Sequence, residues 1–161
     1  MKHRNGFVSN SSSSSFIVCF PTKPENSDEV FDYLFTRNTK VVEYCDIEAD
    51  TKEMSQQIFK DIQTSPEETD IDKLLSGYSG DYEDKAVRDM FNIMKQVNRG
   101  FDEYGSQADE IRKDAFKVFL DKNKDSYICK LNYSDNDGDM HIVMEHGDIF
   151  RNLPHVRFSR H

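Results

Sequence analysis

The sequence is poor in features that would assign an activity or a membrane role. No apolar run approaches the roughly 20 residues that a membrane-spanning helix needs. Residues 1–10 lack the apolar core of a secretory signal, although Lys2 and Arg4 imitate its basic start. The catalytic motifs GxSxG, HExxH and GxxxxGK(S/T) are also missing. We therefore expect no membrane association and a cytoplasmic location.

Cysteine is scarce, and its placement argues against a disulfide framework or a metal site. Cys19, Cys45 and Cys129 are odd in number, far apart and embedded in apolar, strand-like segments, and the chain has no CxxC pair. A zinc site built from them would need histidine partners at matched spacing. We expect reduced cysteines in the core, no bound metal and no cofactor.

Length and aromatic content predict a single folded domain. The 161 residues are enough to bury a core, and 12 Phe and 7 Tyr are spread along the chain, whereas disordered segments are poor in aromatic residues. Within the domain 1–161 we distinguish a serine-rich N-terminal segment, a strand–helix–strand unit, a helical region and a C-terminal hairpin with a tail. Their ranges are 1–15, 16–46, 51–123 and 126–161.

The net charge of −9 is concentrated in the middle of the chain. Residues 25–125 contain 14 Lys and Arg against 25 Asp and Glu, which leaves a balance of +2 for the two ends. Phosphate contacts dominate nucleic-acid affinity and require clustered Lys and Arg, so we expect no general nucleic-acid binding. An acidic surface fits a protein partner with a basic surface, although acidic helices can also serve solubility alone.

Hydrophobic periodicity predicts strands near the ends of the chain and helices in its centre. Residues 16–20 are β-branched and aromatic, which indicates a buried strand, and residues 40–46 indicate a second strand. Between them, Ser27 caps an expected helix that ends near Asn38. Further helices are expected over 87–101 and from Thr51, Ser65 and Ser106 onward.

The C-terminal part predicts a β-hairpin. Residues 126–133 and 139–146 are strand-like, and the Asp-Gly pair between them is typical of a tight primed turn. In that register Leu131 faces Met144 on an apolar side, and the other side is polar. The fold class that we expect is α+β: a small mixed or antiparallel sheet, made by the N-terminal strands and this hairpin, packed by four to five central helices.

The most unusual stretch is residues 6–20, GFVSNSSSSSFIVCF, in which serines lie between two apolar anchors. One interpretation is a flexible, solvated tether, since serines offer no packing to offset the entropy of ordering. The other is an anion-binding loop that presents successive N–H groups and hydroxyls. Its weakness is that the run has no glycine to supply the alternating backbone of such a nest. The anion-binding residues would be Asn10, Ser11, Ser12, Ser13 and Ser14.

The string GFVSNSSSSSF after a short basic segment resembles the N-terminal signature of a broad group of small, uncharacterised proteins of tailed bacteriophages and bacteria. The similarity runs from about Arg4 to Val18 and covers a small fraction of the chain. It implies a phage-type or bacterial cytosolic origin and a serine segment that is more than a random tether. It implies no activity and no catalytic residue.

Polar and titratable groups gather near the end of the chain. We expect His146 at the end of a strand, where a carboxylate such as Asp148 would hold its imidazole. If the last strand lies beside the first, the serine loop comes within reach of His146 or His155, and a serine, a histidine and an acid are the parts of an activated nucleophile. The candidate catalytic residues are His146, His155 and Glu145. The alternative is that these groups are structural or solvated.

Two functions from different classes follow from these patterns. The first is a non-enzymatic, protein-binding modulator of a host or assembly partner that acts through an acidic surface. The second is a Ser/His-dependent hydrolase or transferase that acts on a phosphorylated or nucleotide-like small molecule. A third reading is that the serine run is itself a substrate for modification.

Overall fold

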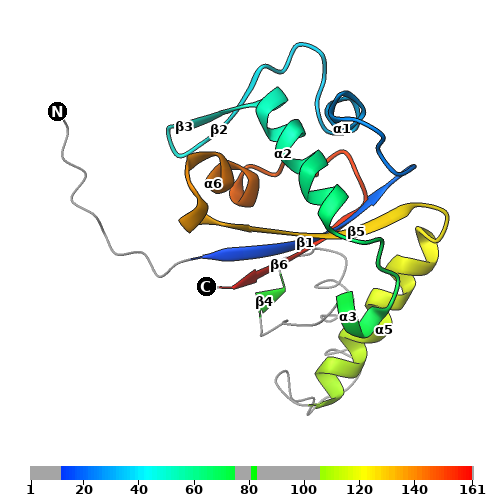
Figure 1. The fold of residues 1–161 in the computed structure, drawn as a ribbon. Helices are drawn as coiled ribbons and strands as arrows, with labels where there is room; N and C mark the ends of the chain where they lie inside the picture. Colours follow the sequence, from blue (N-terminus) through cyan, green and yellow to red (C-terminus); the bar gives the residue numbers. More distant parts are fainter. Residues whose placement is uncertain (1–11, 75–80, 83–105, 161) are drawn as a thin grey trace.

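The computed structural model describes residues 12–74, 81–82 and 106–160, and it places helices on both faces of one antiparallel sheet (Figure 1). The strand order in that sheet is β4 (Asp81–Tyr82), β6 (His155–Arg160), β1 (Ser13–Phe20) and β5 (Tyr127–Ser134). A separate two-stranded sheet pairs β2 (Val41–Tyr44) with β3 (Ile47–Asp50). The predicted α+β class is confirmed.

Strand β1 supplies both hydrophobic cores, because successive residues of a strand point to opposite faces. Phe16, Val18 and Phe20 pack in the larger core, and Ile17 and Cys19 pack in the smaller one. One layer of helices covers the larger core and another covers the smaller core (Figure 1). The first layer consists of α1 (Ser27–Leu34), α2 (Thr51–Thr64) and α6 (Asp139–His146), and the second of α3 (Ile71–Leu74) and α5 (Ser106–Lys122).

The serine run forms the beginning of the central strand. We predicted a strand from Phe16, but β1 begins at Ser13 because its first residues are paired on both edges. Ser13 lies opposite Ser134 of β5 and opposite Arg160 of β6. Strand β6, to which the sequence analysis assigned no secondary structure, therefore lies beside β1. This pairing brings the serines next to the last part of the chain.

The predicted C-terminal hairpin is wrong in its second half. Residues Asp139–His146 form helix α6, which follows a short 3-10 turn, η1 (Asp135–Asp137). Strand β5 instead pairs with β1, so that Leu131 lies opposite Phe16 and not opposite Met144. The apolar residues of 139–146 fit both the two-residue period of a strand and the 3.6-residue period of a helix. Val143 and Met144, which are consecutive, are both buried, as on the inner face of a helix. The predicted apolar face of β5 is correct, but its partner was not.

Three smaller expectations also change. Helix α1 ends at Leu34, before the predicted end near Asn38. Strand β2 pairs with β3 and lies outside the main sheet. The predicted helix from Ser65 begins only at Ile71, because the backbone N–H of Glu68 donates to the carbonyl of Ile128 at 3.1 Å and the segment before α3 is extended. The start of α2 at Thr51 is as predicted, and the helix expected over 87–101 lies outside the described residues.

Candidate functional site

The alternation of β1 divides the serines between two environments. Ser14 points toward α6, on the side of the larger core, and is only 2% exposed. Ser12, just before the strand, reaches the same helix and is 8% exposed. Ser13 and Ser15 are half-buried and line a cavity. The run is therefore neither a solvated tether nor a loop from Ser13 onward.

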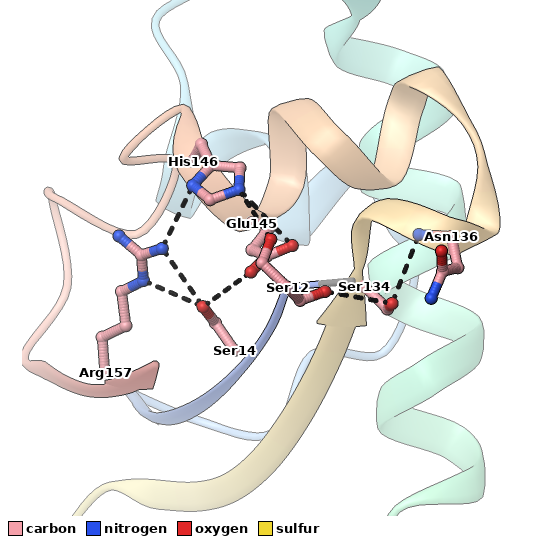
Figure 2. Close-up of polar contacts among 7 residues, drawn as sticks. All are labelled: Ser12, Ser14, Ser134, Asn136, Glu145, His146 and Arg157. Carbon is pink, nitrogen blue, oxygen red and sulfur yellow. Dashed lines mark hydrogen bonds and ion pairs between the residues drawn. The ribbon is translucent and has the colours of Figure 1, made fainter. Parts of the chain in front are cut away.

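On the α6 side, side chains from three elements form what we call the polar cluster: Ser12, Ser14, Glu145, His146 and Arg157 (Figure 2). The Ser14 hydroxyl donates to Glu145 Oε1 at 3.1 Å and accepts from Arg157 Nε at 3.2 Å and Nη2 at 3.1 Å. Glu145 is 1% exposed. A buried carboxylate is costly unless a cation and hydrogen bonds compensate it, and here Ser14 connects it to a guanidinium.

The geometry around His146 fixes which ring nitrogen carries the proton. Arg157 Nη2 lies 3.3 Å from His146 Nδ1, and a guanidinium can only donate, so Nδ1 accepts and the neutral ring is protonated at Nε2. That nitrogen lies 3.3 Å from Ser12 Oγ and 3.5 Å from Glu145 Oε2. The Tyr44 ring stacks on the imidazole with 4.9 Å between centroids. In this arrangement His146 donates to the Ser12 hydroxyl, and Glu145 Oε2 receives no hydrogen bond from the described residues.

The structure brings together most of the predicted catalytic residues, in a different geometry from that expected. His146 is the last residue of a helix and not the end of a strand, and Glu145 is the carboxylate beside it, whereas Asp148 is exposed. His155 is not in the polar cluster. Its Nδ1 lies 2.9 Å from the Leu153 carbonyl oxygen, and its ring packs near the ring of Phe150. Their catalytic role stays a prediction.

Sequence reasoning assigned no role to Arg157. The signal that would have identified it is the alternation of residues 155–160, in which Val156 is buried on one face and Arg157 faces the other. Once β6 pairs with β1, Arg157 lies opposite Phe16 and reaches Ser14, with its guanidinium 5.7 Å from the Phe16 ring centroid.

The described members of the predicted anion-binding set do not form the expected loop of successive N–H groups. Asn10 and Ser11 lie outside the described residues. Ser13 and Ser14 are extended and belong to a strand paired on both edges, so they do not form a nest of successive free N–H groups. Ser12 accepts the N–H of Asp135 on its carbonyl oxygen at 3.3 Å. Anion binding by these residues remains a prediction. At Ser13 it would use the side-chain hydroxyl, whereas the hydroxyl proton of Ser14 is already donated to Glu145 Oε1.

A cavity of about 440 Å³ lies on the opposite side of β1, and we call it the polar cavity. Two of its lining residues, paired on neighbouring strands, are hydrogen-bonded to each other: Ser15 Oγ donates to Asn132 Oδ1 at 2.6 Å. Sequence analysis could not find it, because its walls come from β1, β5, the segment between α2 and α3, and α3 itself, and these elements are distant in sequence. The residues that line it are Ser13, Ser14, Ser15, Ser65, Pro66, Glu68, Lys73, Lys130 and Asn132.

The three cysteines are free, and only two of them lie in the core. Burial raises the pKa of Cys19 and of Cys129 to about 12. Cys45, expected in the core, is exposed at the turn between β2 and β3, where its φ of 48° places it in the left-handed region. The prediction that Cys45 lies in the core is wrong, because the residue falls in the turn that follows β2 and not in a buried strand.

Comparison of the chain with family models, curated proteins and solved structures found no match. Across residues 12–74, 81–82 and 106–160, no helix is long and apolar enough to cross a bilayer. The same residues contain no group of three or more His, Cys, Asp and Glu side chains placed to hold a metal ion. The function therefore has to be argued from the polar cluster, the polar cavity and the charged surface.

Proposed function

We propose that the protein is a non-enzymatic binding protein that modulates a host or assembly partner through an acidic surface centred on β2 and β3. Residues 41–50, which we call the acidic hairpin, contain four carboxylates and no Lys or Arg. Glu43, Asp46, Glu48 and Asp50 are all exposed, while Val42, Tyr44 and Ala49 face inward. The outward face of this hairpin is therefore anionic and open to a partner.

The observation that carries the proposal is the register of the hairpin. Glu43 lies directly opposite Glu48, and both are exposed. Like charges in directly opposed strand positions destabilise a hairpin. A basic partner surface would remove this repulsion on binding. Val41, 46% exposed on the same face, adds an apolar contact beside the carboxylates.

The experiment is affinity purification from bacterial cells with wild-type protein and the variant Glu48→Lys. The substitution turns the opposed glutamates into an opposite-charge pair, so we expect the free energy of unfolding to stay equal or to rise by a few tenths of a kcal/mol, while partner recovery falls. Asp121→Lys, on an exposed position of α5, is the control and should recover the partner normally. Absence of a stoichiometric partner, or normal recovery by Glu48→Lys, would contradict the proposal.

We propose that the protein acts in a bacterial cytosol, which is that of the host if the chain is phage-encoded. We also propose that it does not bind nucleic acids in general. The acidic balance of residues 25–125 supports the second part. The resemblance of residues 4–18 to small phage and bacterial proteins supports the first. Fractionation of expressing cells and a salt-dependent DNA-binding assay test these two points directly.

The alternative function, a Ser/His-dependent hydrolase or transferase for a phosphorylated or nucleotide-like molecule, has one supporting distance. Ser12 Oγ lies 3.3 Å from His146 Nε2. Arg157, however, holds the neutral ring with its proton on Nε2, and a general base for Ser12 needs that nitrogen unprotonated. If the alternative holds, turnover of nucleotide substrates disappears in Ser12→Ala and in His146→Ala. Turnover that is absent in the wild type, or retained in both variants, counts against it.

A further inference from the structure

We propose that the polar cavity binds a small molecule that carries a phosphate group. The cavity lies across β1 from the polar cluster and away from the acidic hairpin, so this site is separate from the proposed protein-binding surface. Its outer wall, residues 65–73, is held by backbone hydrogen bonds from Ser65 N–H to the Asp61 carbonyl at 2.8 Å and from Glu68 N–H to the Ile128 carbonyl at 3.1 Å. A cavity with fixed walls is largely preformed, as ligand sites usually are.

The cavity presents hydrogen-bond donors that the described part of the chain does not use. Within residues 12–74, 81–82 and 106–160, the hydroxyls of Ser13 and Ser65 have no side-chain partner. Asn132 accepts the Ser15 hydroxyl on Oδ1, which leaves its two amide hydrogens for another acceptor. These groups come from three separate segments and converge on one space. An occupant with several acceptor oxygens would satisfy them.

The charge of the lining favours an anion. Among the lining residues that the structure describes, Lys73 and Lys130 carry two positive charges and Glu68 one negative charge, a balance of +1 in a protein of net charge −9. The Glu68 carboxylate already accepts the N–H groups of Thr69 and Asp70 at 3.1 and 2.9 Å and lies 3.6 Å from Lys73 Nζ. Those contacts partly compensate its charge.

A phosphate ester fits these groups better than a simple carboxylate does. It carries a charge of about −1.5 to −2 and three strong acceptor oxygens, which matches two ammonium groups surrounded by hydroxyl and amide donors. The volume of about 440 Å³ lies within the range of roughly 300–1,000 Å³ for small-molecule sites, so it also accommodates the polar body of the ester. Inorganic phosphate shares the chemistry but would leave much of this space empty.

The test is a titration of ¹⁵N-labelled full-length protein with AMP, adenosine and inorganic phosphate, followed by NMR. We expect saturable shifts of the cavity residues with AMP, weaker ones with phosphate and none with adenosine. Lys73→Gln combined with Lys130→Gln should weaken AMP binding about tenfold or more, because each lysine can make a charge-assisted hydrogen bond. Lys60→Gln, an exposed lysine on α2, is the matched control and should bind normally.

The proposal would be overturned by the absence of saturable shifts, by shifts confined to other surfaces, or by unchanged AMP affinity in the double lysine variant. If that variant fails to fold, the single change Lys73→Gln decides, since its side chain is 70% exposed and its loss leaves the core intact. A phosphate response as strong as that to AMP would reject the ester as the ligand. Failure here leaves the partner-binding result with Glu48→Lys untouched, because the acidic hairpin does not line the cavity.

Discussion

The two sides of the first residues of β1 contain the same amino acid in different roles. On the α6 side, Ser14 is sealed and connects a buried glutamate to an arginine. On the opposite side, Ser13 and Ser15 are half-buried and open into a cavity. The neighbouring strands create the difference, since β6 brings Arg157 to one face and β5 brings Lys130 and Asn132 to the other. In a run of identical residues, position along the strand decides the role.

This contrast has an energetic consequence. The polar cluster holds a carboxylate that is 1% exposed, and Oε2 of Glu145 has no hydrogen-bond partner among the described residues. Removing a compensating group from such a carboxylate is expensive. Among the described residues, the cavity side contains no comparably buried charge, and water can replace a lost hydrogen bond there. We therefore expect substitutions on the cluster side to cost stability and those on the cavity side to change ligand binding.

The largest expected effect is on stability at high pH. It tests whether both faces of the main sheet exclude water equally well in the part of the sheet that lies past the serine residues of β1. Cys19 lies on the cavity side and Cys129 on the cluster side, and burial raises both pKa values from 9.0 to about 12. Above pH 9 the unfolded thiols lose their protons while the folded ones keep them. Stability should therefore fall between pH 9 and pH 12, by about 1.4 kcal/mol per pH unit for each thiol, and should not depend on these groups at lower pH.

Urea denaturation of the wild type and of Cys19→Ala and Cys129→Ala across this pH range measures the effect. Each variant should lose about half of the thiol-dependent slope. Iodoacetamide labelling of the native protein should modify Cys45 and spare the other two. Labelling of Cys19 in the native state would show that water reaches the core from the cavity side, and the two faces would then differ over the whole strand.

The next effect concerns the cation of the polar cluster. Arg157→Met should lower the free energy of unfolding by about 3 kcal/mol or more, because it leaves the Glu145 carboxylate buried without its guanidinium. Arg151→Met, at an exposed position, is the control and should change stability by less than about 0.5 kcal/mol. Chemical denaturation of both variants provides the comparison.

A double variant separates the lost charge from lost packing. If the uncompensated carboxylate causes the destabilisation, adding Glu145→Gln to Arg157→Met should recover part of the stability. A double variant less stable than Arg157→Met alone would point to packing of the arginine, for example on the Phe16 ring, as the main contribution. The proposed link between the two charged groups would then be wrong.

Local sequence patterns correctly predicted the elements whose secondary structure does not depend on which other segments they pack against. The β-branched and aromatic residues of 16–20, the apolar alternation of 127–133 and the start of α2 at Thr51 all appear in the structure. The prediction of a strand over 139–146 was wrong because these eight residues have apolar positions at both the strand spacing and the helix spacing. Which structure forms depends on the pairing of β1 with β5, which leaves no place for 139–146 beside β5 in the predicted hairpin. Strand choice is a long-range property, and no local pattern contains it.

The candidate site was predictable in content and not in geometry. The density of titratable residues near the end of the chain drew attention to Glu145 and His146, which the structure places in the polar cluster. Their arrangement depends on helix α6, which was predicted as a strand because its residues alternate. The position of Arg157 depends on strand β6, which was not predicted. The polar cavity was out of reach, because Lys73 and Lys130 become neighbours only when the extended segment after α2 crosses the end of β5.

The most direct test of the contrast compares Ser14→Ala with Ser15→Ala, two adjacent and chemically identical substitutions. Ser14→Ala should lower the free energy of unfolding by about 1–3 kcal/mol, because Glu145 and Arg157 lose the hydroxyl that they share. Ser15→Ala should cost less than about 0.5 kcal/mol, since the exposed Asn132 can bond to water instead. Equal losses in urea denaturation would contradict the claim that one side of the strand is sealed around a buried charge and the other is open.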